Sequence, residues 1–220
     1  MDIKNTIAKR VAKELKSGDV VNLGIGLPTW VANHVPSDVH VIFQSENGIL
    51  GLGSAPPADA IDPDIFDAGC ANATILPGAW FFDSATSFGL IRGGHVDVTV
   101  LGALQVDQEG NLANWMVPGK MIAGYGGAMD LVTCAKKVIL AMEHTVKGNP
   151  KIFNKCTFPL TGTKCVDLIV TEMAVIEVTK EGLVLREIAE GVSLQQIKDA
   201  TEADLIIPEN INTMPVVNFS

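Results

Sequence analysis

The chain has 220 residues, a net charge of −9, 47% hydrophobic and 5% aromatic residues, and 21 glycines. This composition excludes a disordered chain and indicates a compact protein, for which we expect one domain over residues 1–220. The acidic balance, with no cluster of five basic residues, argues against a nucleic-acid groove or a patch for anionic membranes.

The termini, apolar runs and thiols narrow the class of protein further. No apolar run reaches the length of a membrane span, and the first five residues lack a secretory core, so we expect a cytoplasmic protein. The four cysteines contain no Cys-x-x-Cys pair and are expected to be reduced. The four histidines stand singly, so no metal site is predicted.

The chain opens with a pattern of helix, strand and glycine loop. Apolar residues recur every four positions over residues 3–15, which predicts an amphipathic helix. A short apolar run at residues 20–23 predicts a buried strand. Gly24 and Gly26 follow at once, and Pro28 suits the first turn of a second helix.

A second strand is predicted over residues 39–44, and Glu46 comes directly after it. Open α/β sheets bind ligands beyond the carboxyl ends of their strands, so this position is one where chemistry is common. The alternative is that Asn47 and Gly48 form only a turn, with Glu46 as its solvated shoulder.

The middle of the chain alternates between loops, helices and strands. Residues 51–64 are rich in glycine and proline and predict a surface excursion. A helix over residues 84–92 and a strand over residues 96–101 follow. Apolar segments at residues 104–106 and 112–117 flank a polar turn, which predicts a hairpin.

The last part repeats the same order of elements. A second glycine loop, with Gly126 and Gly127, opens a short helix, and strands are predicted at residues 138–142 and 166–170. A hairpin over residues 175–185 and a late helix with a capping box follow, and residues after 208 carry little signal. The whole pattern predicts an α/β fold: an open, mostly parallel sheet with flanking helices and added hairpins.

The first glycine loop has two chemical interpretations. A dinucleotide-binding loop is one, because Glu46 lies 46 − 24 = 22 residues after Gly24, where a ribose-binding acid would stand. The third glycine of that motif is replaced by Thr29. A nicotinamide-dinucleotide-dependent dehydrogenase therefore stays as an alternative to a tight turn whose backbone approaches a phosphate or thioester.

The second glycine loop and the carboxylate suggest acyl chemistry. Gly126 and Gly127 form either a steric turn or a pair of N–H donors for an oxyanion. A carboxylate such as Glu46 attacks an activated acyl group, and the anhydride or thioester so formed survives only where water is excluded.

Several segments resemble the family I coenzyme A transferases. Ser45-Glu46-Asn47-Gly48 is similar to the family signature, and residues 24–28 and 126–131 are similar to its two glycine motifs, in the same order. Residues 87–107 and 114–121 also resemble the β subunit of acetoacetate-type transferases.

This resemblance implies the β subunit of a 3-oxoacid or acetate/butyrate–acetoacetate CoA transferase, working with a separate α subunit as a hetero-tetramer. It implies transfer of CoA between a short-chain acyl-CoA and a free carboxylic acid through a thioester on Glu46, with Gly126 or Gly127 as oxyanion donor. CoA is then a substrate, and no bound cofactor or metal is implied. A non-catalytic acyl-CoA-binding subunit remains a further alternative.

The resemblance also implies contacts with CoA or the reacting thioester for Gly24, Gly26, Asn47 and Gly48. For Arg92, Lys120 and Lys137, solvated surface charge is favoured over contact with CoA phosphates.

Overall fold

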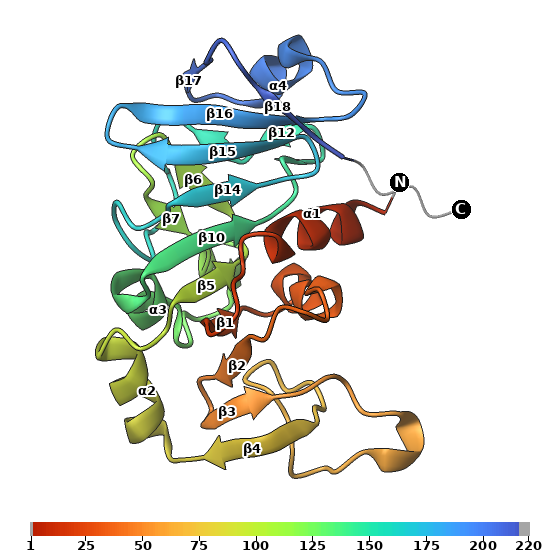
Figure 1. The fold of residues 1–220 in the computed structure, drawn as a ribbon. Coiled ribbons are helices and arrows are strands. Elements are labelled where there is room, and N and C mark those ends of the chain that lie inside the picture. Colours follow the sequence, from red (N-terminus) through yellow and green to blue (C-terminus); the bar gives the residue numbers. More distant parts are fainter. Residues whose placement is uncertain (1, 216–220) are drawn as a thin grey trace.

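The computed structural model describes residues 2–215, which form an 11-stranded sheet flanked by helices (Figure 1). In spatial order the sheet contains β17 (Leu205–Ile206), β16 (Gly182–Ala189), β15 (Ala174–Thr179), β14 (Leu168–Val170), β10 (Lys137–Ala141), β5 (Val98–Leu101), β1 (Val20–Leu23), β2 (Ile42–Ser45), β3 (Ile49–Leu52) and β4 (Ile75–Phe81), with β18 (Asn212–Met214) beside β16. The helices are α1 (Ile3–Ala12), α2 (Ser84–Arg92), α3 (Ala128–Cys134) and α4 (Leu194–Ala200), with two 3-10 helices, η1 (Leu27–His34) and η2 (Ala58–Ala60).

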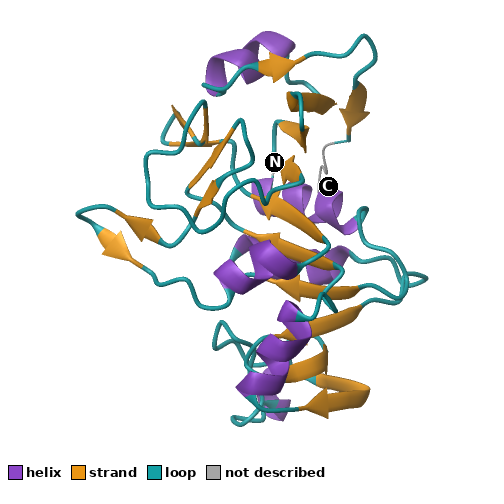
Figure 2. Ribbon diagram, turned by 90° about the vertical axis from the view of Figure 1, so that its left-hand side faces the viewer, coloured by secondary structure: helices purple, strands orange, loops and turns teal. Residues whose placement is uncertain are grey.

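Three small sheets lie beside the main one (Figure 2). They consist of β13 (Ile152–Phe153) with β6 (Gln105–Asp107) and β7 (Leu112–Ala113), of β8 (Met116–Val117) with β9 (Met121–Ile122), and of β11 (Thr145–Val146) with β12 (Asn149–Pro150).

The centre of the main sheet is parallel and its flanks are partly antiparallel. Strands β2, β1, β5, β10 and β14 run parallel to their neighbours, whereas β3 with β4 and β15 with β16 form antiparallel pairs. This arrangement confirms the predicted α/β fold with a mostly parallel sheet and added hairpins.

Alternation along the central strands sends side chains to two separate cores. Val98 and Val100 of β5 pack in the same cluster as Ile7 and Val11 of α1. Leu101 of β5 lies in a second cluster, which includes residues of α3 and α4. Helices therefore cover both faces of the sheet, as an open parallel sheet requires.

The direction of winding changes at β1. After β1 the chain passes through η1 to β2 on one side, and it then returns through β3, β4 and α2 to β5 on the other side. Ligands of open α/β sheets bind near such a switch point, outside the carboxyl ends of the strands. Gly24 follows β1, and Glu46 follows β2, at this end.

The segment between β2 and α2 differs most from the sequence prediction. Strand β2 begins at Ile42 rather than residue 39, and residues 49–52 form β3 instead of a glycine-rich loop. Gly51 lies opposite Ala79, whose Cα would be only 3.0 Å from a Cβ at residue 51, so the glycine permits a close approach of two strands. Strand β4 was not predicted, because Pro77 and Gly78 interrupt its apolar pattern.

Three further elements differ in detail. The helix predicted after Pro28 is the 3-10 helix η1, in which Thr29 N–H donates to Gly26 O. The predicted strand over residues 112–117 is divided between β7 and β8, which pair with different partners. Strand β18 lies in the tail that carried little signal. Residues 1 and 216–220 of the predicted domain lie outside the described residues.

Residues 2–215 lack two features that would point to other classes of protein. They contain no helix that is long and apolar enough to cross a bilayer. They also contain no group of three or more His, Cys, Asp or Glu side chains arranged to hold a metal ion.

His144, which follows β10, is fully buried. Its ring nitrogens lie 2.9 Å from Thr171 Oγ1 and 2.8 Å from Thr201 Oγ1, so it connects the end of β14 with the end of α4. Burial, together with the nearby charge of Lys151, lowers the pKa of His144 from 6.5 to about 4. The buried ring is therefore neutral near pH 7.

The free energy of unfolding is expected to fall as the pH drops from 6.5 toward 4. Over this interval His144 takes up a proton in the unfolded chain but not in the folded chain, which favours unfolding by about 3 kcal/mol in total. Urea midpoints measured at about pH 7 and about pH 4.5 should show the loss. His144→Gln should reduce the difference, and His95→Gln, at an exposed histidine, should keep it. Equal pH dependence in both variants would contradict this assignment.

Candidate active site

Glu46 lies in the three-residue turn between β2 and β3. The preceding residues Gln44 and Ser45 are buried, Glu46 is half-buried, and Asn47 is exposed. Gly48 N–H donates to Ser45 O at 3.0 Å, which closes the turn. The carboxylate is therefore attached to a rigid strand end and still reaches the surface.

A row of polar side chains lies beneath this turn. Asn22 of β1 is in register with Gln44 of β2 and with Thr99 of β5, and all three are buried. Asn22 Nδ2 donates to Glu46 Oε2 at 3.0 Å and to Gln44 Oε1 at 2.8 Å. Gln44 Nε2 in turn donates to Ser87 Oγ of α2 at 3.0 Å. The Glu46 carboxylate thus has a fixed donor, which is itself held in place.

Two polar atoms of this row lack partners among the described residues: Asn22 Oδ1 and Thr99 Oγ1. A buried polar atom without a hydrogen bond costs about 1–3 kcal/mol. Such a cost in the middle of a sheet is unusual and indicates that the row serves chemistry rather than stability. Sequence reasoning did not single out Asn22, although a lone polar residue within the apolar run of β1 was the available signal.

The second glycine loop reaches the same carboxylate. Gly127 is buried, and a Cβ at this position would lie 3.2 Å from Glu46 Cγ and 3.4 Å from Oε1. The absence of a side chain therefore lets the backbone lie directly against Glu46. Gly126 is exposed, has a φ of +51° and has open space around it. The structure brings Glu46 and Gly127 together, as the two motifs suggested.

The first glycine loop lies at the end of β1. Gly24 N–H donates to Val100 O at 2.8 Å, and a Cβ on Gly24 would lie 3.0 Å from Leu101 Cδ2. Gly26 is exposed with a φ of +86°. Close packing against β5 explains the first glycine, and backbone conformation explains the second.

Asn47 and Gly48 hold the turn itself. The Asn47 side chain donates to Phe66 O at 2.8 Å, and Ser45 Oγ accepts from Ala68 N–H at 2.9 Å. Gly48 has a φ of +121°, and a Cβ there would overlap the carbonyl oxygen of Phe82. Both residues thus have structural partners that fix the position of Glu46.

The basic residues considered for CoA phosphates differ in their surroundings. Arg92 forms an ion pair with Asp130 at 2.7 Å, and Lys137 forms one with Glu14 at 2.6 Å. Lys120 is exposed in the turn of the β8–β9 hairpin. Intramolecular partners therefore occupy Arg92 and Lys137.

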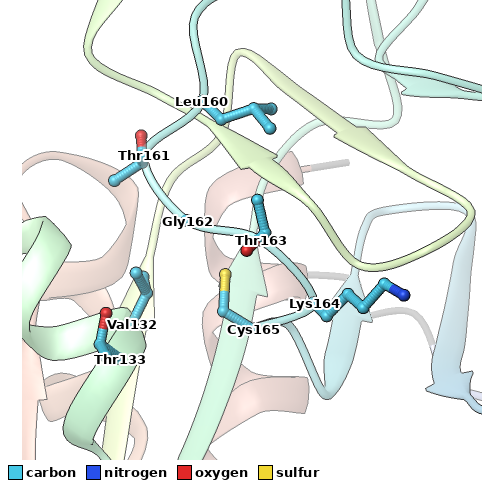
Figure 3. A pocket seen from close by; sticks show the side chains of 8 residues that line it. All are labelled: Val132, Thr133, Leu160, Thr161, Gly162, Thr163, Lys164 and Cys165. Atoms are coloured by element: carbon cyan, nitrogen blue, oxygen red, sulfur yellow. The ribbon is translucent and has the colours of Figure 1, made fainter.

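A cavity of about 390 Å³ lies between α3 and residues 160–165 (Figure 3). Val132 and Thr133 line it on the helix side, and the amine of Lys164 points away from that side. None of the residues predicted to act on or bind the substrate lines this cavity. The residues gathered around Glu46 are therefore the better candidate for the active site.

Comparison with known proteins gives consistent matches. The family model described as "Coenzyme A transferase" matches residues 4–200. The beta chain of the acetate CoA-transferase of Escherichia coli K12 is 55% identical, over 97% of this chain and 98% of its own length. The B component of the Helicobacter pylori 26695 succinyl-CoA:3-ketoacid coenzyme A transferase is 53% identical, over 92% of this chain and 98% of its own length.

Longer relatives and solved structures share the fold. The human mitochondrial succinyl-CoA:3-ketoacid coenzyme A transferase 2 is 48% identical over 98% of this chain, which spans only 42% of that protein. An acyl-CoA transferase structure from E. coli O157:H7 has a TM-score of 0.77 at 24% identity, over 96% of this chain and 43% of that chain. The AibA/AibB decarboxylase has a TM-score of 0.72 at 18% identity, over 98% and 89%.

These matches favour neither the dehydrogenase nor the non-catalytic acyl-CoA-binding alternative, because the relatives matched over their whole length are named as transferases. Since the family model covers most of the chain and close relatives align nearly end to end, the chain belongs to the coenzyme A transferase family.

Proposed function

We propose that the chain is the β subunit of a short-chain CoA transferase that acts on acetate, acetoacetate or related acids. The names of the relatives at 53–55% identity, which specify acetate and 3-ketoacids, support this choice of acids. The structural observation that carries it is the Glu46 carboxylate at the end of β2, held by Asn22 and packed against the Gly127 backbone.

In the proposed reaction, a Glu46 oxygen attacks the carbonyl carbon of an acyl-CoA and displaces CoA as its thiolate, which leaves a mixed anhydride. The thiolate then attacks the glutamyl carbonyl and releases the first acid, and Glu46 now carries CoA as a thioester. A second carboxylate attacks this thioester and regenerates an anhydride. The thiolate finally attacks the acyl carbonyl of the second acid, which frees Glu46. One thioester is exchanged for another, so the sequence balances without a bound cofactor.

The surrounding residues are assigned by their contacts. Asn22 holds one carboxylate oxygen so that the other faces the substrate, and the N–H of Gly126 or Gly127 is proposed to stabilise the oxyanion. Gly24 and Gly26 are proposed to lie along the path of the pantetheine arm. For Asn47 and Gly48 the contacts favour a positioning role over direct binding of CoA.

The proposal includes a separate α subunit and a hetero-tetramer, in a single β-subunit domain without bound nucleic acid or membrane. The word "beta" or "B" in the names of the relatives supports the partner. Glu46 is half-buried, and an anhydride there needs a partner surface that excludes water. A cytoplasmic location is supported by the four cysteines, all of which are free thiols.

Acetoacetyl-CoA added to the assembled subunits without an acceptor acid should trap the thioester. The peptide containing Glu46 should gain the mass of CoA, and borohydride should remove the adduct because it reduces thioesters. Mass spectrometry after proteolysis measures both changes. An active preparation whose Glu46 peptide stays unmodified would reject the covalent mechanism.

Glu46→Gln should lower turnover by about 10⁴-fold, because the amide keeps the shape but loses the nucleophile. Release of thiol with and without an acceptor acid separates transfer from hydrolysis. Glu143→Gln, which removes an exposed carboxylate elsewhere, is the matched control and should leave turnover unchanged. Retained activity in Glu46→Gln would assign the chemistry to another residue.

Asn22→Asp should lower kcat by roughly 10- to 100-fold with little change in KM, because a charge-assisted hydrogen bond to the nucleophile becomes a repulsion. Thr99→Val is the control, since it alters the same buried row without touching Glu46. Both variants should be compared in kinetics and in thermal melting. Equal losses of activity in the two would indicate only a structural role for the row.

Gly127→Ala should also reduce kcat, because its methyl group would press on Glu46 Cγ from 3.2 Å. Gly89→Ala is a matched control: Gly89 lies within α2, a methyl group there would have no neighbour within 4 Å, and alanine favours helices. Steady-state kinetics with the assembled enzyme measure the difference. Unchanged kcat in Gly127→Ala would argue against a close fit between the loop and Glu46.

A further inference from the structure

Strand β4 forms one edge of the main sheet and carries exposed apolar side chains. It is the last strand in spatial order and pairs, among the described residues, only with β3 (Figure 1). Trp80 and Phe81 are 58% and 51% exposed, and Ile75 and Leu76 are exposed as well. Large apolar side chains gathered on one exposed strand are typical of a protein-binding surface.

The two edges of the sheet differ sharply in charge. Strand β17, at the far edge, has two residues and is flanked by exposed Glu202, Asp204 and Glu209. Short length and charge are the usual protection of an exposed sheet edge. Residues 70–82, which include β4, contain no Asp, Glu, Lys, Arg or His, in a chain with 16 basic and 25 acidic residues. The β4 edge therefore lacks the charges that would keep other proteins away.

The backbone of β4 is nevertheless unsuited to adding another strand. Leu50 and Leu52 of β3 pair with Trp80 and Ile75, so β4 contains a bulge between these contacts. The bulge includes Pro77, which has no N–H, and Gly78, which has a φ of +85°. Regular pairing along the edge is interrupted there, and side chains rather than backbone groups are left to make a contact.

The aromatic side chains are already ordered. The rings of Trp80 and Phe82 lie 5.5 Å apart with an interplanar angle of 77°, an edge-to-face contact. An exposed tryptophan held in this way loses little conformational freedom on binding, which favours association.

We propose that the β4 edge binds the β4 edge of a second copy of this chain about a two-fold axis. In a symmetric contact, residues near the axis meet their own copies, so every ionisable residue there faces a like charge. Two chains with a net charge of −9 repel each other least where residues 70–82 meet, because that segment is uncharged. An unlike partner would impose no such restriction on charge, which favours a second copy as the occupant.

This contact would explain how two αβ pairs join into the proposed hetero-tetramer. It rests on the proposed function in one respect, namely that an α subunit covers the half-buried Glu46 and leaves the β4 edge for the second copy. The measured quantity is the mass of the complex, which does not depend on CoA transfer.

The test is Trp80→Glu, compared with the unmodified chain in complex with the α subunit. Sedimentation equilibrium should give two copies of each subunit for the unmodified complex, and one of each for the variant. Pairing through β4 should weaken by about 30-fold or more, as for other buried interface tryptophans. Leu76→Glu should have the same effect, so the test does not depend on a single variant.

Ile206→Glu is the matched control, because it places the same charge on the opposite edge at an exposed isoleucine. It should leave the mass unchanged, and thermal melting should show that all three variants are folded. An unmodified complex with one copy of each subunit would overturn the proposal, and so would folded β4 variants that keep the full mass. A complex of full mass that fails to transfer CoA would instead reject the proposed function alone.

Discussion

The parallel register between β1 and β2 is the constraint on which the site depends. It sets Asn22 beside Gln44, two residues before Glu46, so that a single side-chain amide reaches both the strand neighbour and the carboxylate. A shift of one residue would turn Asn22 to the other face of the sheet and leave Glu46 without its donor. The nucleophile is therefore positioned by the pairing of strands in the core, and the turn only carries it to the surface.

The two glycine loops meet Glu46 because of the order of the strands. Since winding reverses at β1, the loop after β1, the turn after β2 and the loop before α3 are brought to one end of the sheet from segments about a hundred residues apart. Gly24 and Gly127 permit close approaches that any side chain would prevent. Open topology and small residues together create a surface against which an acyl group and a thiol can be held.

Much of this arrangement could be predicted from local pattern. Apolar periodicity identified α1, β1, β5 and β10, and cap residues identified α2 and α4, because these signals depend on neighbours in sequence. Strands β3 and β4 were missed because a cross-strand approach at Gly51 and a bulge at Pro77 hide their alternation. Glu46 and its glycines could be chosen by type and spacing. Asn22 could not, since its role arises only when β1 and β2 pair.

The unpaired oxygens of Asn22 and Thr99 have a consequence for evolution and engineering. A sheet interior optimised for stability alone would replace both residues with valine or leucine, which fill the same space without unsatisfied polar atoms. Selection for heat resistance, without selection for turnover, would thus be expected to erode the support beneath the nucleophile first. The strands under the reactive turn hold a compromise in which some stability is given up to keep activity.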